Sequence, residues 1–344
     1  MKRLHLLHLG IGNVGAALVM QIQENRNRIK REKGIDLTYC GIFSSKGGIF
    51  QKNGLNEAEL KEKKFLPQVD VQKVIEKMPL PFVLIDTTAS EETIPFIEKV
   101  LKQGGFVVLS NKKPLTGYQK QFERLNRYNE KLFYETTVGA GLPVIQTIKT
   151  LQATGDDVIT IQGCFSGTLG FICSAIEDGM DYSQAVAEAK GKGFTEPDPR
   201  DDLSGLDVAR KALILARLMG QKKKLKDIPV EKLYPENMSS LTIDAFMKRI
   251  KTLDIFYREK MKNAKRAGNT VRFVAEINKS KIRVGLTEVP KGSSLGNLKG
   301  PDNIISIQTM RYFKNPLIIQ GPGAGKEITA AGVFGDILTI AGVL

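Results

Sequence analysis

Residues 4–22 read LHLLHLGIGNVGAALVMQI, and this stretch decides the fold. A short apolar run meets Gly10-x-Gly12-x-x-Gly15, and a helical apolar pattern follows at once. A strand, a glycine turn and a helix in this order make a dinucleotide-binding unit, whose helix N-terminus faces the phosphates. Gly10 permits the tight turn, Gly12 lets a pyrophosphate approach backbone N–H groups, and Gly15 lets the helix pack on the strand. The expected cofactor contacts in this turn are Gly10, Gly12, Asn13, Val14 and Gly15.

The residues after the second strand bear on the choice of cofactor. We expect that strand at 37–43, and it is followed by Ser44, Ser45 and Lys46. A site that prefers NAD places Asp or Glu here to bind the ribose 2′-hydroxyl. Because a carboxylate is absent and a cation is present, the sequence favours NADP over NAD through Ser44 and Lys46. A solvated loop lysine is the alternative interpretation of Lys46.

Further strands and helices alternate up to about residue 134. Strands are expected at 82–86 and 106–109, with a helix at 91–103 between them. This order predicts an α/β fold with a parallel, helix-covered sheet. Ligands of such sheets lie beyond the carboxyl ends of the strands, where Thr88 and Lys112 fall. Lys112 lies in the loop SNKKP, at the expected nicotinamide edge; an ordinary surface lysine is the alternative.

The pattern of expected helices and strands changes from residue 135 onward. A glycine turn and a helix lead into a short strand at 158–161, and helices are expected at 183–190 and 205–219. The stretch 221–316 is rich in lysine and has strand-like pieces at 271–277, 282–287 and 304–308. This mixture predicts a second domain of α+β type. The chain then closes on a glycine loop, GPGAG, that leads into a helix.

Composition excludes several classes of protein. The 344 residues carry 51 basic and 37 acidic side chains, a net charge of +14, with 42% hydrophobic residues. These values are those of a globular protein of about two domains. The apolar runs are far shorter than the ~20 residues of a membrane span, and the start lacks a signal-peptide cleavage site. The three cysteines form no CxxC pair, so we expect a reducing, cytoplasmic location and no structural zinc.

The densest group of chemically useful residues is GFTEPDPRDDLSGLDVARKALILARLMG, residues 193–220. Its first part is a proline-punctuated loop rich in carboxylates, and a helix is expected from Ser204 to Gly220. That helix is apolar almost all round, so it is expected to be buried, yet it places Asp207 and Lys211 on one face. Such a buried pair indicates a site. The alternatives are a structural ion pair, or a capping box between Ser204 and Asp207.

Histidine chemistry is excluded by count, since only His5 and His8 are present, both near the start. This removes a histidine base and a Ser-His-Asp triad. None of the eight tyrosines has a lysine four residues on, which removes the Tyr-x-x-x-Lys mechanism of short-chain dehydrogenases. A mechanism based on lysine and carboxylate groups remains.

Taken together, these blocks resemble the homoserine dehydrogenase family. The resemblance rests on GIGNVG, SNKKPL, ETTVGAGLP, GCFSGTLGFI, the long block within 193–217 and the closing GPGAGKEITAAGV, in order along the whole chain. It implies the NAD(P)-dependent interconversion of L-homoserine and L-aspartate 4-semialdehyde, on the route to threonine, methionine and isoleucine. It also implies a dinucleotide domain of residues 1–134 plus 317–344, with a Rossmann-type sheet, around a substrate and dimerisation domain of residues 135–316.

The resemblance also implies roles for individual residues. Lys211 is the acid/base lysine that gives a proton to the aldehyde oxygen, and Lys112 assists between cofactor and substrate. Glu196 binds the substrate amino group, Asp207 holds the substrate and orients Lys211, and Asp202 adds carboxylate contacts. Two glycines of the closing loop line the nicotinamide site, namely Gly323 and Gly325.

A sodium ion and a homodimer are implied as well. The ion is held by the Glu135 side chain with the carbonyls of Val138, Ala140 and Leu142; a simple hinge entering the next helix is the alternative. The dimer would form through a sheet, with strand-like segments near 300–316. Because the chain ends soon after the last helix, we expect neither a fused kinase nor a threonine-sensing extension.

Two other functions stay open at this point. One is a related two-domain oxidoreductase that acts on another small aldehyde. The other is a non-catalytic dinucleotide sensor that binds DNA through basic clusters at 26–33, 221–226 and 258–266. These clusters lack a helix-turn-helix signature and aromatic interleaving. We therefore expect a small-molecule substrate, and neither nucleic acid nor a membrane as partner.

Overall fold

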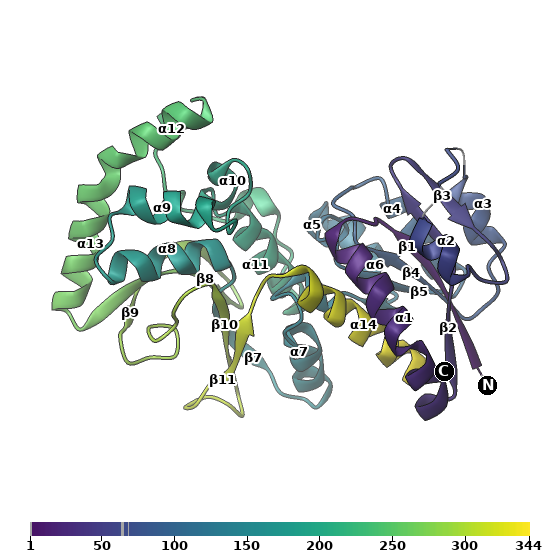
Figure 1. Cartoon of the computed structure of the whole chain (residues 1–344). Coiled ribbons are helices and arrows are strands. Elements are labelled where there is room, and N and C mark those ends of the chain that lie inside the picture. The colour runs from purple at the N-terminus through teal and green to yellow at the C-terminus, as the bar shows by residue number, and fades with distance from the viewer. Residues whose placement is uncertain (1, 63–64, 68) are drawn as a thin grey trace. The chain divides into compact units, whose positions relative to one another are not determined.

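The structure is a computed structural model that describes residues 2–62, 65–67 and 69–344 (Figure 1). The chain forms two compact units. The first comprises Met1–Gly141 and Ala324–Leu344, and the second comprises Leu142–Gly323. Both boundaries lie later in the chain than the sequence suggested. The second is later because the strand at 317–322 pairs with its neighbour in the second unit. In the described residues no helix is long and apolar enough to cross a membrane.

The first unit is built on one sheet of strand order β3-β2-β1-β4-β5-β6. All neighbouring strands run parallel except β2 and β3, which form a hairpin. This confirms the α/β, Rossmann-type expectation. The elements are β1 Lys2–Leu9, α1 Asn13–Lys33, β2 Ile35–Ser44, β3 Gly47–Phe50, α2 Glu57–Glu62, α3 Val71–Glu76, β4 Phe82–Asp86, α4 Ile94–Lys102, β5 Phe106–Leu109, α5 Lys113–Thr116, α6 Gln119–Asn126, β6 Leu132–Phe133, the 3-10 turn η1 Glu135–Thr137, and α14 Lys326–Gly342.

The last helix returns to this first unit and packs beside α1 (Figure 1). Apolar residues at helical spacing on α14, including Val333 and Ile337, are fully buried in one cluster with Leu18 and Ile22 of α1 and Leu37 of β2. The first unit is therefore completed by residues more than 300 positions apart in the sequence.

The second unit is built on an antiparallel sheet of strand order β11-β10-β7-β8-β9. This confirms the expectation of a second, α+β domain. The elements are α7 Val144–Ala153, β7 Val158–Cys164, α8 Gly167–Glu177, α9 Tyr182–Gly191, α10 Pro199–Leu203, α11 Leu206–Leu218, the 3-10 turns η2 Leu225–Asp227 and η3 Glu236–Met238, α12 Ile243–Arg249, η4 Ile250–Leu253, α13 Asp254–Arg266, β8 Asn269–Asn278, β9 Ile282–Pro290, β10 Asp302–Thr309 and β11 Leu317–Pro322.

Four helices of this unit were not predicted from the sequence. No helix was expected at 167–177, where α8 forms, in the proline-punctuated loop that holds α10, or in the lysine-rich stretch that holds α12 and α13. Helix α8 is apolar nearly all round, so it shows no polar face. Its start is nevertheless signalled by Ser166, whose hydroxyl accepts a hydrogen bond from the Leu169 N–H.

Candidate active site

The glycine turn joins β1 to α1 in the first unit. Gly10 has a φ of 89°, a left-handed conformation that favours glycine. A Cβ on Gly15 would lie 2.2 Å from the carbonyl oxygen of Gly10, so only glycine lets the helix approach the turn this closely. The Thr87 hydroxyl donates to that same oxygen at 2.6 Å. The turn is thus held by packing on one side and by a hydrogen bond from the end of β4 on the other.

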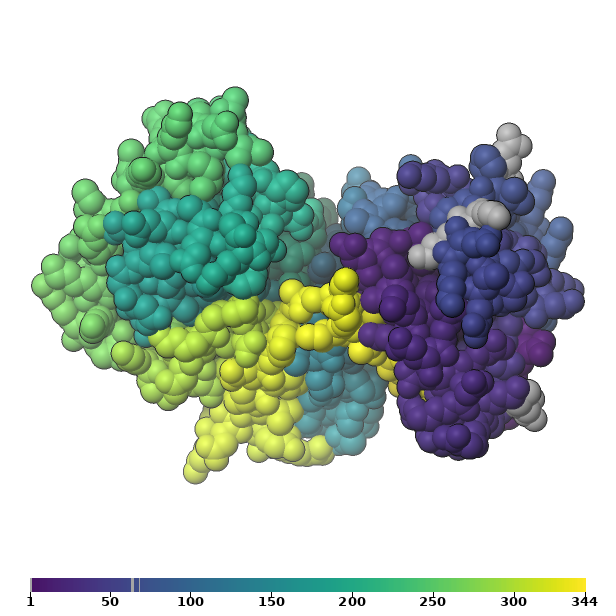
Figure 2. All heavy atoms as spheres, in the orientation of Figure 1, coloured from purple at the N-terminus to yellow at the C-terminus, as the bar shows by residue number. Residues whose placement is uncertain are grey.

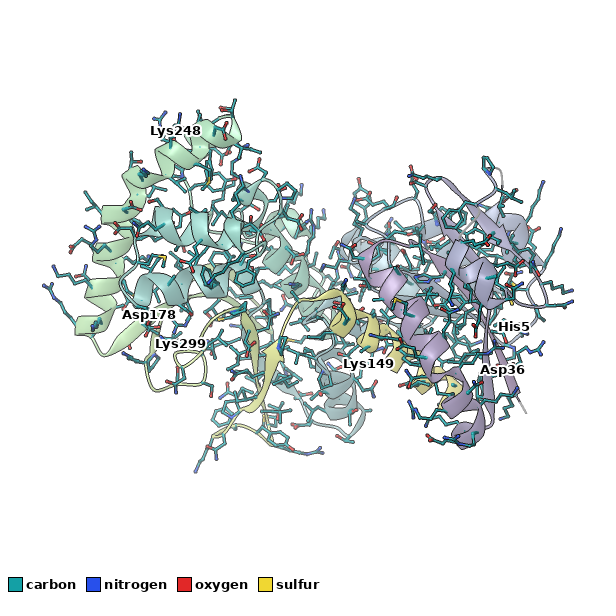
Figure 3. The ribbon with its side chains drawn as sticks, viewed as in Figure 1. His5, Asp36, Lys149, Asp178, Lys248 and Lys299 are labelled. Carbon is teal, nitrogen blue, oxygen red and sulfur yellow. The ribbon has the colours of Figure 1, made fainter. Side chains whose placement is uncertain are left out.

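Both histidines lie on β1 within this unit, and neither occupies a cleft. His8 is fully buried, and its Nε2 lies 2.9 Å from the Thr87 hydroxyl oxygen. Since that hydroxyl donates to Gly10, Nε2 is the donor in this pair. His5 lies beside the Cys40 thiol at 3.3 Å, on the strand next to Asp36 (Figure 3). Burial lowers the pKa of His5.

A cavity of about 660 Å³ opens beside the glycine turn. Of the predicted cofactor residues, five line it: Gly10, Gly12, Ser44, Lys46 and Thr88. Asn13, Val14 and Gly15 form the first turn of α1 behind it. The lining also includes residues that the sequence analysis missed: Phe43, Phe65, Val71, Ser90, Glu92, Thr93 and Phe96. Their apolar members come from separate loops and helices, and no local motif marks them.

The end of β2 presents hydroxyls and a cation to this cavity. The Ser44 hydroxyl accepts a hydrogen bond from the Lys46 N–H at 3.1 Å, which fixes the turn after the strand. Lys46 itself is exposed. Residues 44–46 supply no carboxylate, so nothing here repels a phosphate on the ribose 2′-oxygen.

Lys112 stands at the N-terminus of α5, after β5. It is half-buried, and its carbonyl accepts a hydrogen bond from the Thr116 hydroxyl at 3.1 Å. It lies outside the lining of the 660 Å³ cavity. The structure therefore fixes its backbone at the carboxyl edge of the sheet, where the sequence analysis expected it.

In the second unit, Lys211 lies on α11. Only 8% of the residue is exposed. Its Nζ lies 2.9 Å from Asp207 Oδ2 and donates to the Phe165 carbonyl oxygen at 2.6 Å. The i, i+4 pair expected from the sequence is therefore formed, on a helix whose other residues are mostly buried. These two contacts use two of the three N–H donors of an ammonium group.

Asp202 organises the loop that carries Glu196. Its carboxylate accepts from the Glu196 N–H at 2.8 Å and lies 3.0 Å from the Thr168 hydroxyl. That hydroxyl is also 2.5 Å from the Phe194 carbonyl. Burial raises the pKa of Asp202, against these hydrogen bonds, which lower it. Asp202 thus holds the backbone of Glu196, whose own side chain is exposed.

Other residues of this block are structural. The Asp198 carboxylate caps α10 and binds the Arg200 guanidinium, which holds the pKa of Asp198 below its usual value. The capping box between Ser204 and Asp207 is not formed. Gly205 is the N-cap of α11, with φ 69°, and Ser204 ends α10, where its hydroxyl donates to the Asp201 carbonyl. The sequence predicted a loop before Ser204 and one helix from Ser204 onward, whereas the structure has two helices separated by the left-handed Gly205.

The loop expected to hold sodium is a tight turn with hard oxygen donors. Glu135 is 9% exposed, and Ala140, with φ 53°, is a non-glycine residue in the left-handed region. Such a turn directs successive carbonyls away from regular secondary structure. Buried carboxylate and carbonyl oxygens suit a hard cation, so the residues fit one. The Leu142 carbonyl already accepts from the Val144 N–H at 2.9 Å. No group of three or more His, Cys, Asp or Glu in the described residues forms a metal site of its own.

The closing glycine loop is packed tightly at Gly323. A Cβ there would lie 1.9 Å from the side chain of Asn303, which is fully buried on β10. The amide N and O of Asn303 have no hydrogen-bond partner within the described residues. Gly325 is the N-cap of α14, in the first unit. The two glycines predicted to line the nicotinamide site thus belong to different units.

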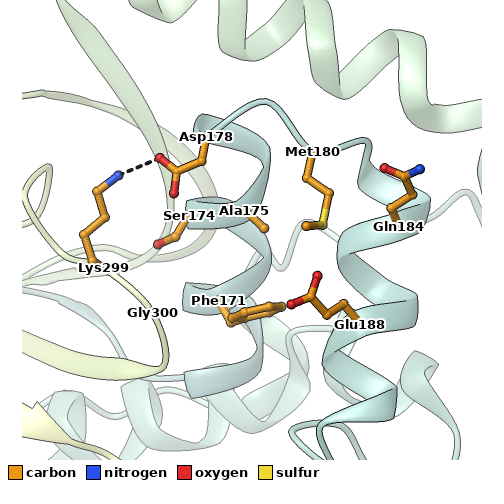
Figure 4. A pocket seen from close by; sticks show the side chains of 9 residues that line it. All are labelled: Phe171, Ser174, Ala175, Asp178, Met180, Gln184, Glu188, Lys299 and Gly300. Carbon is orange, nitrogen blue, oxygen red and sulfur yellow. Dashed lines mark hydrogen bonds and ion pairs between the residues drawn. The ribbon is translucent and has the colours of Figure 1, made fainter.

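A second hollow, of about 500 Å³, lies between α8 and α9 (Figure 4). Its charged residues are paired: Lys299 contacts Asp178 at 3.2 Å, and Glu188 contacts Lys192, which lies outside the lining, at 2.7 Å. Asp178 and Lys299 lie close together on the unit's surface (Figure 3). None of its lining residues lies on α11, so this hollow is distinct from the site built on that helix.

Comparisons with known proteins agree with this architecture. Residues 143–338 match the model of the homoserine dehydrogenase family, and residues 10–135 match the NAD binding domain of homoserine dehydrogenase. Homoserine dehydrogenase of Emericella nidulans is 36% identical over 96% of each chain. Bifunctional aspartokinase/homoserine dehydrogenase 1 of Zea mays is 38% identical over 98% of this chain, which spans 38% of that protein's length.

A similar solved structure is a hyperthermophilic archaeal homoserine dehydrogenase in complex with NADPH. It superposes with a TM-score of 0.74 at 26% identity, over 98% of this chain and 97% of that one. The fold, the family models and a relative of matching length agree. The chain therefore belongs to the homoserine dehydrogenase family, with that family's NAD-binding domain in its first unit.

Proposed function

We propose that this chain reduces L-aspartate 4-semialdehyde to L-homoserine, reversibly, with NAD(P)H, in the synthesis of threonine, methionine and isoleucine. The observation that carries the proposal is the Lys211–Asp207 pair, held at 2.9 Å on a buried helix of a homoserine dehydrogenase family member. A buried ammonium beside a carboxylate is suited to protonating a substrate oxygen.

Lys211 is the proposed acid. When bound, a dinucleotide would supply the hydride that reduces the aldehyde carbon, which leaves negative charge on the carbonyl oxygen. An N–H of Lys211, the one not used by Asp207 and Phe165, donates to that oxygen and transfers its proton there. The ammonium also stabilises the developing negative charge before the proton moves. The reverse reaction uses neutral Lys211 as the base.

Other groups bind and orient the substrate. Glu196 receives its ammonium, and Asp207 fixes Lys211 while holding the substrate. Asp202 acts through the backbone of Glu196, whose N–H it binds at 2.8 Å, and so fixes the position of the Glu196 carboxylate. Lys112 assists the charge change from the dinucleotide side. Gly323 and Gly325 line the nicotinamide.

The proposed cofactor is NADP, with NAD as the alternative. Support comes from Ser44 and Lys46, which present two donors and no carboxylate at the end of β2. The archaeal relative was solved in complex with NADPH. We also propose a sodium ion on the turn of Glu135, Val138, Ala140 and Leu142, whose Ala140 has a left-handed backbone.

A homodimer and a cytoplasmic location complete the proposal. Strand β11 is the edge of the antiparallel sheet, and its residues alternate between half-buried and exposed. The turn before it projects from the surface in Figure 2 and carries exposed Met310, Tyr312 and Phe313. An exposed edge strand with apolar neighbours is suited to pairing with a second copy. The three cysteines are free thiols, as a reducing compartment requires.

The deciding experiment is an assay of NADP⁺ and NAD⁺ reduction by L-homoserine, at matched concentrations, with and without sodium. Turnover that is higher with NADP⁺ is expected. A parallel series with unsubstituted small aldehydes and NADPH tests whether the amino-acid substrate is required. Absence of turnover with both cofactors would overturn the proposed function.

A further inference from the structure

A buried carboxylate lies at the carboxyl end of β4, in the first unit. Asp86 is the last residue of that strand, and none of its surface is exposed. Burying a carboxylate costs several kcal/mol unless hydrogen bonds replace its water. Asp86 is not among the residues expected to bind cofactor or substrate. Its hydrogen bonds show the structural role of its carboxylate.

Three donors from two separate loops converge on Asp86. Its Oδ1 accepts from the Thr88 N–H at 2.9 Å. Its Oδ2 accepts from the Thr93 hydroxyl at 2.7 Å and from the Asn111 side-chain amide at 3.0 Å. Thr88 and Thr93 belong to the loop after β4, and Asn111 belongs to the loop after β5. One carboxylate therefore ties together two loops that come from neighbouring strands.

Asn111 connects Asp86 to the backbone around Lys112. Its amide N–H groups reach the Ser90 carbonyl at 2.7 Å as well as Asp86, and its amide oxygen accepts from the Lys113 N–H at 3.1 Å. Lys112 lies between Asn111 and Lys113 in the chain. The backbone on both sides of the lysine is therefore fixed by a side chain that is itself anchored on Asp86.

The other loop carries Thr88 into the 660 Å³ cavity. The hydrogen bond from the Thr88 N–H to Asp86 sets that residue's backbone. A Cβ on Gly10 would lie 2.8 Å from the Thr88 methyl group, so Thr88 also packs on the glycine turn. Asp86 consequently controls the spacing between the glycine turn, Thr88 and Lys112.

We propose that Asp86 is a positioning residue for hydride transfer, which sets Thr88 against the dinucleotide and Lys112 beside the reacting atoms. The inference rests on the proposed function and deepens it. A carboxylate is required because it has only acceptors, whereas an amide at the same place offers one oxygen and two N–H groups. In Asp86→Asn at least one donor therefore meets another donor, and one loop shifts.

The test is a set of four variants: Asp86→Asn, Asn111→Ala, the double variant, and Ile85→Val as a control. Ile85 is fully buried on the same strand, and its shortening removes one methylene without touching either loop. NADPH affinity is measured by fluorescence titration, kcat and KM by the homoserine assay, and Tm by thermal denaturation. The titration needs no turnover, so it reports on Asp86 even if homoserine is not the substrate.

We expect Asp86→Asn to weaken NADPH binding roughly tenfold and to lower kcat by about tenfold or more, because small misplacements of reacting groups have large effects on rate. Ile85→Val is expected to lower Tm while leaving Kd and kcat within about twofold of wild type. Since Asp86 and Asn111 share one hydrogen bond, the double variant should lose less than the sum of the two single losses.

Two results would overturn the proposal. One is an Asp86→Asn protein whose Kd and kcat match those of Ile85→Val at an equal loss of Tm, which would make Asp86 purely structural. The other is full additivity of the two single variants, which would mean that they act independently. If Asp86→Asn does not fold, Asn111→Ala carries the same comparison with Ile85→Val from the other loop.

Discussion

The two units place their polar residues by different means. In the first, the groups around the dinucleotide cavity lie in loops at strand ends, and hydrogen bonds from Thr87 and to Asp86 hold those loops. In the second, Lys211 and Asp207 lie on a rigid, mostly buried helix. A helix fixes its side chains through packing, whereas a loop needs a network. Under the proposed function, catalysis by the second unit would depend on single side chains, and binding by the first would depend on backbone geometry.

The largest expected effect contrasts the two lysines. Lys211→Ala removes the proposed proton donor, and we expect kcat to fall by about 10³-fold or more, because general acid–base groups contribute 10²–10⁴-fold. Lys112→Ala should also abolish turnover. In both variants NADPH affinity should change little, since neither lysine lines the 660 Å³ cavity. Steady-state kinetics with NADPH titration are the measurement, and full activity in either variant would refute its role.

A second contrast lies within the glycine turn. Gly15→Ala places a Cβ 2.2 Å from a backbone oxygen, and we expect it to destabilise the fold by about 1–3 kcal/mol, as overpacking does. Gly12→Ala meets no atom within 4 Å, so its Tm should stay near wild type. It should instead weaken NADPH binding, because the pyrophosphate approaches there. Thermal denaturation and NADPH titration of both proteins separate the two effects, and an unchanged Tm in Gly15→Ala would count against this packing.

A smaller effect is expected at Lys46. Lys46→Ala removes the cation near the proposed 2′-phosphate, and we expect the ratio of NADPH to NADH affinity to drop roughly tenfold, since 1.4 kcal/mol corresponds to a factor of ten. NADH affinity should stay the same. Titrations at two salt concentrations provide the check, because an exposed charge contact weakens as salt rises. Equal losses for both cofactors would assign Lys46 a general role in binding instead.

The smallest effect concerns pH. Burial raises the pKa of Asp202, so the folded protein disfavours its ionised form relative to the unfolded chain. This penalty is absent below the unfolded value of 3.8, grows as pH rises from 3.8 to the higher folded value, and is constant above it. Asp202→Asn should therefore lose less stability than wild type over that rise. Tm measured across acidic pH tests this, and parallel curves for the two proteins would contradict it.

Local motifs could be predicted from the sequence, and long-range networks could not. The glycine turn and the Asp207–Lys211 pair depend on spacings of five residues or fewer, so the sequence predicted both. The contact between Asp86 and Asn111 joins the end of one strand to the loop after the next, and no pattern marks it. The lining residues Phe65 and Phe96 were missed for the same reason.

The misses in the second unit have local causes. Helix α8 lacks a polar face, so its periodicity is hidden, and only the cap at Ser166 shows where it begins. The separation of α10 from α11 depends on the left-handed conformation of Gly205. A glycine permits this conformation, but its presence in a sequence does not predict it. The domain boundary near residue 317 was placed too early, because β11 pairs with β10 in the second unit rather than with the first unit.

The return of α14 to the first unit has a consequence for synthesis of the chain. Ala330, Val333, Ile337 and Ile340 complete the core around α1, so a growing chain cannot finish this unit until they leave the ribosome. The second unit, Leu142–Gly323, is continuous and is made entirely before them. It is therefore free to fold first, while the earlier-made half waits with Leu18 and Ile22 uncovered. The N-terminal part of the first unit, which is translated first, would therefore need a chaperone that binds exposed apolar surface for the longest time.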